Sequence, residues 1–291
     1  MSDILHRKIR ETPRVAVSAR LGRITDAEGR EYIDACSGAA VSIFGHAHPR
    51  LIQAAKTQME AVDFAHTGHF TTEVYERLGS ELVAASNGDF SRAMVFSSGT
   101  DAVEAALKLA RQHFVEKGET RRSRFITRRQ SYHGNSLGAL SVGGNMARRK
   151  LFEPLLFEVS MVGDCNAYRR KNEDESAEDF GLRMARELDD ELNRLPEGTV
   201  IAFIAETMVG ATSGAVPPPP GYLAEIRRIC DDHGVLLILD EIMCGFGRTG
   251  DLFAYRPEGM SPDILTMGKG LGGGVLPVSA VMAAEKVIAP I

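Results

Sequence analysis

Apolar positions along the chain form helix-like and strand-like runs that alternate. Apolar residues recur at helical spacing in five segments, which predicts helices over 49–62, 72–86, 100–117, 178–195 and 221–233. Short continuous apolar runs predict strands over 92–97, 124–129, 200–206, 235–241, 263–268 and 277–283. Residues 20–36 alternate on either side of an Asp-Ala-Glu-Gly turn, which predicts a β-hairpin. Apolar strands separated by helices are typical of a mostly parallel sheet that helices cover on both faces.

Size and charge narrow the class of protein. A length of 291 residues allows two domains or one large α/β domain, and 44% apolar residues suffice for a core. Lys and Arg number 34 against 39 Asp and Glu, and a net charge of −5 argues against general nucleic-acid binding. No apolar run reaches the ~18 residues that a membrane span needs, so we expect no membrane partner.

The cysteines and the first twenty residues indicate the cellular compartment in which the protein is expected. The four cysteines lie far apart and contain no Cys-x-x-Cys pair, which favours reduced thiols over a disulfide scaffold or a zinc site. The first twenty residues lack the apolar stretch of a secretory signal. We therefore expect a cytoplasmic protein. The arginines of this segment leave a mitochondrial location as the lesser alternative, against which Asp3 and Glu11 count.

A small polar turn follows the first predicted strand of the sheet. Ser97, Ser98, Gly99 and Thr100 join this strand to the helix over 100–117. Free N–H groups and the helix dipole favour an anion at such a helix N-terminus, and the hydroxyls add donors. The turn is a candidate phosphate site, with an ordinary N-cap as the alternative.

Two charged residues follow later strands. Asp240 ends the most apolar predicted strand, where open α/β sheets bind ligands, although an Asp can also cap the next loop. Lys269 follows the strand over 263–268 and is flanked by glycines. A partly buried lysine has a lowered pKa and acts as a nucleophile, whereas an exposed lysine in a flexible loop is the alternative.

Tyr132 lies in a Tyr-His-Gly turn after the strand over 124–129 and could stack on a planar ligand or serve as a half-buried structural residue. The paired histidines at 46 and 48, and at 66 and 69, lack further ligands at standard spacing, so we expect no metal site. A phosphate site, an aromatic ring, a carboxylate and an amine at strand ends together suit pyridoxal phosphate.

The sequence resembles the class III (ω-type) aminotransferases of fold type I. The most specific part of the resemblance is the stretch LLILDEIMCGFGRTG followed by PDILTMGKGLGGG. Four further segments extend the resemblance over roughly residues 20–285, namely CSGAAVSIFGHAHP, FSSGTDAVEAALKLAR, SYHG and FIAETM. The resemblance implies an α/β fold with a seven-stranded, mostly parallel sheet in a cofactor-binding domain over 49–291. It implies that residues 1–48 belong to a small domain whose C-terminal part is absent from this chain, which would make the chain a fragment, a truncated product or a degenerate relative.

The resemblance also implies roles for single residues. Lys269 would form the Schiff base with pyridoxal phosphate and shuttle a proton, and Asp240 would bind the pyridine nitrogen. The phosphate would be held by Ser98, Gly99 and Thr100. The other implied cofactor contacts are Tyr132 and Ile242 on the two ring faces and Glu206 in the network around Asp240. Glu206 is followed by Thr207 where the family usually has proline.

The implied activity is transfer of an amino group from an amine or ω-amino acid to a keto acid, such as pyruvate or 2-oxoglutarate, by a homodimer. Racemases, aminomutases and phospho-lyases share the lysine and the aspartate and remain alternatives. A non-catalytic relative that only binds a partner is a further alternative.

Overall fold

A computed structural model of the protein describes residues 2–291, which form two compact units. The first unit extends to Phe70 and includes Gly272–Pro277, and the second comprises Thr71–Leu271 and Val278–Ile291. The sequence predicts a boundary between residues 48 and 49, whereas this division by compactness follows Phe70. The helix that begins at Pro49 therefore lies in the first unit.

The first unit contains an antiparallel sheet with the order β1-β2-β3. Its elements are β1 (Ala16–Arg20), β2 (Arg23–Asp26), β3 (Glu31–Ile33), α1 (Ser37–Ala40) and α2 (Pro49–Ala61). β2 and β3 form the predicted hairpin. The buried carboxylate of Asp26 accepts bonds from the Glu28 and Arg30 amides at 3.1 and 2.8 Å, and Gly29 adopts a φ of +78° in the turn. The hairpin prediction is confirmed, and β1 is an additional strand.

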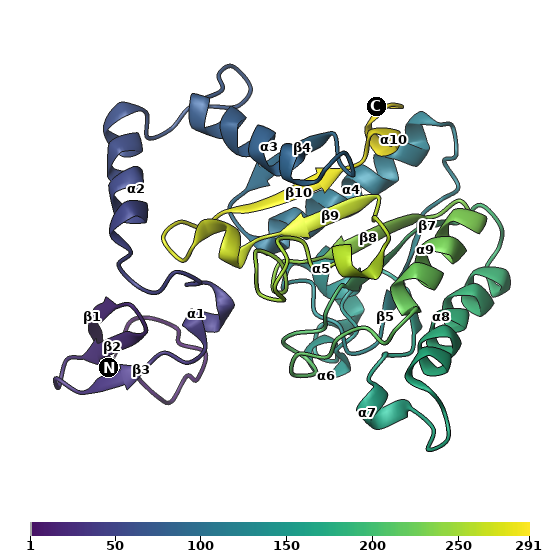
Figure 1. Ribbon diagram of the computed structural model, residues 1–291, viewed down its shortest axis with the longest axis horizontal. Coiled ribbons are helices and arrows are strands. Elements are labelled where there is room, and N and C mark those ends of the chain that lie inside the picture. Colours follow the sequence, from purple (N-terminus) through teal and green to yellow (C-terminus); the bar gives the residue numbers. More distant parts are fainter. Residues whose placement is uncertain (1) are drawn as a thin grey trace. The chain divides into compact units, whose positions relative to one another are not determined.

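The second unit is built on a seven-stranded sheet with the order β4-β10-β9-β8-β7-β5-β6 (Figure 1). Its strands are β4 (Arg92–Phe96), β5 (Arg124–Arg128), β6 (Ser160–Val162), β7 (Val200–Glu206), β8 (Leu236–Asp240), β9 (Ile264–Met267) and β10 (Ser279–Ala283). β10 is antiparallel to β4 and β9, and the remaining pairs are parallel. The mostly parallel sheet is confirmed. The three-residue β6 was not predicted from the pattern because it is too short to show a period.

The helices of this unit are α3 (Glu73–Ala85), α4 (Gly99–Glu116), α5 (Leu137–Ser141), α6 (Met146–Arg149), α7 (Ala167–Arg170), α8 (Ala177–Arg194), α9 (Tyr222–Asp232) and α10 (Glu285–Ile288). The four long helices predicted here are confirmed to within about a residue at each end. The short helices α5, α6, α7 and α10 were not predicted.

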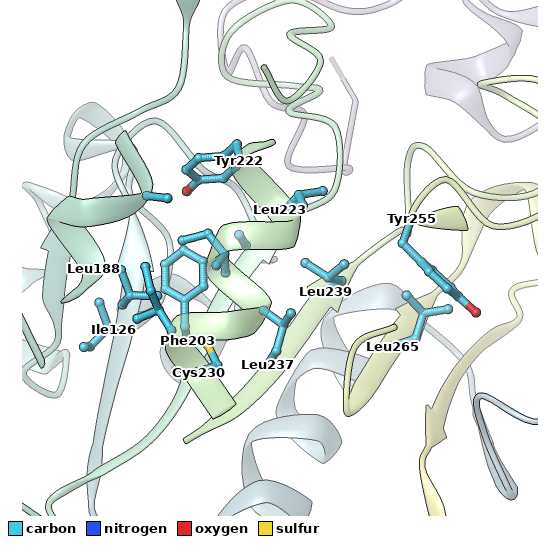
Figure 2. Packing of buried hydrophobic residues seen from close by; sticks show 14 of the residues in the cluster. Ile126, Leu188, Phe203, Tyr222, Leu223, Cys230, Leu237, Leu239, Tyr255 and Leu265 are labelled. Carbon is cyan, nitrogen blue, oxygen red and sulfur yellow. The ribbon is translucent and has the colours of Figure 1, made fainter. Parts of the chain in front are cut away.

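Two apolar cores cover the two faces of the sheet because successive strand residues point to opposite sides. Phe203, Leu237 and Leu239 face α8 and α9, where Leu188, Leu223 and Cys230 meet them (Figure 2). Ile204 and Ile238, the alternate positions of the same strands, belong to the other core, together with the inner face of α4. Helices on both faces are therefore confirmed.

Parallel pairing brings the carboxyl ends of β5, β7, β8 and β9 to one edge of the sheet. Glu206 at the end of β7 pairs in register with Asp240 at the end of β8, and Asp240 in turn pairs with Thr266 of β9. Residues that follow these strands therefore converge at this edge, although they are far apart in sequence.

Candidate active site

A cavity of about 180 Å³ opens at the carboxyl edge of the sheet. Seven residues predicted for the site line it, namely Gly99, Thr100, Tyr132, Glu206, Asp240, Ile242 and Lys269. Five further lining residues were not predicted, namely His133, Gly134, Met208, Ala211 and Met243. The structure thus gathers residues from four strand ends and one helix N-terminus around one space.

Asp240 is 4% exposed and its two carboxylate oxygens have different partners. Oδ2 lies 2.8 Å from His133 Nδ1, and Oδ1 accepts a bond of 3.0 Å from the Ile242 amide. The backbone bond favours one orientation of the carboxylate, and the imidazole supports it from the side. The other imidazole nitrogen of His133, Nε2, is buried and has no hydrogen-bond partner among the described residues.

Glu206 holds two segments that line the cavity. Its Oε1 accepts from the Tyr132 amide at 3.2 Å, and its Oε2 accepts from the Gly210 amide at 3.1 Å. Burial raises the pKa of Glu206, and the nearby His133 opposes this rise. The carboxylate therefore joins the turn after β5 to the loop after β7.

Arg128, at the end of β5, is fully buried behind Glu206. Its Nη2 donates to the Glu206 carbonyl at 2.6 Å, and its Nη1 lies 3.0 Å from Cys165 Sγ. Nearby Cys165, Tyr222 and Glu206 raise the pKa of Arg128 although burial opposes its charge. The guanidinium is thus a buried cation near the buried Glu206, and nothing in the sequence indicates this beyond its position before the Tyr-His-Gly turn.

Lys269 follows β9 and reaches the cavity with a partly buried side chain. Burial lowers the pKa of its amine, while the charges of Asp240 and Glu206 act in the opposite direction. Its backbone φ of +43° lies in the left-handed region that side-chain-bearing residues seldom adopt. A lysine with these properties is a candidate nucleophile.

The N-terminus of α4 forms the polar end of the cavity. Ser98 Oγ accepts from the Asp101 amide at 3.2 Å and donates to the Asp101 carboxylate at 2.8 Å, so it is the N-cap of α4. Ser98 is not among the residues that line the cavity, and its predicted phosphate contact stays a prediction. Gly99 and Thr100 do line the cavity, where the first amides of a helix have no partner within the helix.

Gly99 is also required for close packing, because a Cβ there would lie 2.8 Å from Ile242 Cδ1. Ile242, in the loop after β8, thus packs against the N-terminus of α4. Its side chain also lines the cavity with an apolar surface. The cavity therefore fits a flat aromatic ligand that carries a phosphate and a basic ring nitrogen. It offers an anion-binding helix start, an aromatic ring, an aliphatic side chain and a buried carboxylate.

The other candidate sites form no comparable centre. His46 pairs with Asp34 at 2.8 Å, and the rings of His66 and His69 lie 5.5 Å apart. Within residues 2–291, no group of three or more His, Cys, Asp or Glu residues could hold a metal ion. No helix in the same range is long and apolar enough to cross a membrane.

Comparison with known proteins gives one family. The family described as Aminotransferase class-III matches residues 4–291. The chain is 39% identical over 281 residues to an aminotransferase of Gibberella zeae, a match that covers 95% of this chain and 55% of that protein. It is 36% identical over 277 residues to the acetylornithine aminotransferase of Methanopyrus kandleri, covering 94% and 63%. The chain therefore spans little more than half of the length of these curated relatives.

Solved structures agree with this result. An (S)-enantioselective omega-transaminase from Thermomicrobium roseum has a TM-score of 0.91 at 33% identity, covering 97% of this chain and 62% of that chain. An amine transaminase from an uncultivated Pseudomonas species, in the PLP-bound form, has a TM-score of 0.92 at 30% identity, covering 98% and 64%.

Proposed function

We propose, from the premise that this chain belongs to the class-III aminotransferase family, that its second unit binds pyridoxal phosphate and that the protein transfers amino groups. The observation that carries the proposal is the convergence of Lys269, Asp240, Tyr132 and the start of α4 on one cavity. These residues come from separate strand ends, so their meeting is a property of the fold rather than of one motif.

Each residue of the cavity has a separate binding task. The amides of Gly99 and Thr100 would bind the phosphate, and Tyr132 and Ile242 would contact the ring. Asp240, fixed by His133 and the Ile242 amide, would accept a hydrogen bond from the protonated ring nitrogen. A charge pair at ~4 Å is worth roughly 4 kcal/mol at an effective dielectric constant of 20, which keeps that nitrogen protonated.

Lys269 supplies the reactive amine. The lowered pKa increases the fraction of uncharged Lys269 amine, which would hold the cofactor through its aldehyde group with loss of water. With a substrate amine bound there instead, Lys269 Nζ would be free to move a proton at the substrate carbon that bears the amino group. The bound cofactor supplies an electron sink for the negative charge that develops at this carbon.

The finer assignment concerns the substrates. We infer an amine or ω-amino acid as donor and pyruvate or 2-oxoglutarate as acceptor. In support, a relative that is 35% identical is named a taurine–pyruvate aminotransferase, and it acts on the substrates in its name. Racemase, aminomutase and phospho-lyase reactions use the same lysine and aspartate, but the similar proteins carry aminotransferase names, which favours transfer.

We also propose a cytoplasmic homodimer. Leu151, Leu155 and Phe157 of the second unit lie close together in sequence and are 80%, 63% and 43% exposed, and a second copy would cover such exposed apolar side chains. Three of the four cysteines are buried, and a reducing compartment would keep all four as thiols.

The test begins with cofactor attachment. The 291-residue chain is mixed with pyridoxal phosphate, reduced with borohydride and mapped by mass spectrometry, beside Lys269→Ala. We expect the cofactor mass on Lys269 of the wild-type chain and on no residue of the variant in stoichiometric amount. Equal labelling of both proteins, or none of the folded wild type, would contradict the proposed site. Amine consumption that proceeds without a keto acid would contradict transamination.

A further inference from the structure

The turn that carries Tyr132 is held in place by side chains of α4, the helix whose N-terminus lines the cavity. Residues 129–136 connect β5 to the five-residue helix α5 and include the cavity residues Tyr132, His133 and Gly134. A helix as short as α5 has little stability of its own. The position of this turn therefore depends on side chains from other elements.

Two residues on one face of α4 make the contacts. Thr100 and Glu104 are four positions apart, which places them one turn apart on the same side of the helix. Thr100 Oγ1 lies 3.3 Å from Asn135 Oδ1, and a Cβ at Gly134 would lie 2.6 Å from the same hydroxyl oxygen. The backbone of the turn thus packs directly on Thr100.

Glu104 makes the second contact, at the start of α5. Its Oε1 accepts from Ser136 Oγ at 2.5 Å and from the Ala139 amide at 3.2 Å. A Cβ at Gly138 would collide with this carboxylate, so the glycine leaves the space that Glu104 fills. A carboxylate at a helix N-terminus also interacts favourably with the helix dipole.

The other end of α5 is held by a charge of opposite sign. The buried Arg149 donates from Nη1 to the carbonyls of Leu140, Ser141 and Gly143. Arg149 comes from α6, whereas Glu104 comes from α4, which also begins at the phosphate site. Glu104 and Thr100 therefore both link the turn that carries Tyr132 to α4, and Glu104 does so at the start of α5.

We propose that Glu104 is a positioning residue for the cofactor. It fixes the turn with Tyr132 and Gly134 against α4, so that the distance between the phosphate-contacting residues and the ring-contacting Tyr132 stays constant. This inference rests on the proposed binding of pyridoxal phosphate. Glu104 is outside the cavity lining and acts through Ser136 and the amide of Ala139.

The experiment compares three variants of the whole chain. Glu104→Ala removes both hydrogen bonds, and Glu104→Gln keeps one acceptor oxygen without the charge. Glu116→Ala is the matched control, because Glu116 is an exposed acidic residue on the same helix. The measurements are amide hydrogen exchange over 131–145 in the cofactor-free chain, the dissociation constant of pyridoxal phosphate, and the visible circular dichroism of bound cofactor per unit of absorbance.

We expect Glu104→Ala to speed exchange at Ala139 and to weaken cofactor binding about tenfold, which corresponds to about 1.4 kcal/mol. Its circular dichroism per unit of absorbance falls because Tyr132 no longer holds a fixed position beside the ring. Glu104→Gln restores most of the lost affinity, and Glu116→Ala matches the wild type in all three measurements.

Two results would overturn the inference. One is unchanged affinity and circular dichroism in Glu104→Ala when the wild type binds cofactor. The other is weaker binding with an unchanged circular dichroism ratio and no rescue by Glu104→Gln, which would reduce Glu104 to a general contributor to stability. A wild-type chain that binds no pyridoxal phosphate would instead refute the proposed function, and the exchange data on Ala139 would still report whether Glu104 holds the turn.

Discussion

Replacing His133 by alanine tests whether the buried His133–Asp240 pair stabilises the ligand-free protein. The variant removes the bond of 2.8 Å to Asp240 and leaves the carboxylate, which is 4% exposed, with the hydrogen bond from the Ile242 amide. A hydrogen bond to a charged group contributes about 1.5–3 kcal/mol, and loss of the packed imidazole adds to this. We therefore expect the free energy of unfolding to fall by about 3 kcal/mol.

The assay is urea unfolding of the cofactor-free chain at fixed pH, followed by far-ultraviolet circular dichroism. His133→Asn is informative because its side-chain amide can still donate to Asp240, so we expect about 1 kcal/mol of destabilisation or less. His233→Ala is the matched control: His233 Nε2 lies 2.7 Å from Asp189 Oδ1, but this pair is partly exposed. Such surface pairs contribute about 1 kcal/mol or less.

The reasoning would be refuted if His133→Ala and His233→Ala lost the same stability. Equal losses would mean that burial adds nothing to the pair at Asp240. Equal losses in His133→Ala and His133→Asn would likewise show that the hydrogen bond is not what stabilises the carboxylate.

Two further predictions concern packing and pH. Gly99→Ala should weaken pyridoxal phosphate binding at least about tenfold, because the new Cβ meets Ile242 Cδ1 at 2.8 Å. In cofactor titrations the same change should weaken binding less in an Ile242→Ala background than in the wild type, and equal losses in the two backgrounds would count against this contact. Burial raises the pKa of Glu241 to about 7 from 4.5, so its contribution to stability is complete below pH 4.5 and is lost as pH rises to about 7. Urea midpoints should therefore decrease over this range in the wild type and change less in Glu241→Gln, and parallel pH profiles would exclude Glu241 as the source.

The sequence predicts the long elements well because their signals are local. The helices around Leu107 and Leu188 each show a helical period, and the strands around Phe203 and Leu237 each form a continuous apolar run. Each signal lies within one segment, and each element lies where it was predicted. The strand-end positions of Asp240 and Lys269 follow from the same pattern, so their approach to one cavity could be anticipated.

Contacts between distant segments could not be predicted in this way. His133 and Asp240 are 107 positions apart, and nothing in the Tyr-His-Gly turn alone indicates which nitrogen meets which carboxylate. The role of Glu104 depends on where a five-residue helix packs, and such a helix is too short to produce a readable period. Both an N-cap and a phosphate ligand suit the position of Ser98: its hydroxyl is the N-cap of α4, and its phosphate contact stays a prediction.

The left-handed backbone at Lys269 means that the residue best suited to folding differs from the residue needed for chemistry at this position. A φ of +43° is unfavourable for any residue with a Cβ and is easily adopted by glycine. A laboratory evolution experiment that rewards only thermal tolerance of the cofactor-free chain would therefore enrich glycine at position 269, and every such winner would lack the reactive amine. Retention of lysine at this position in a lineage would be a record that the lineage had been selected for its chemistry.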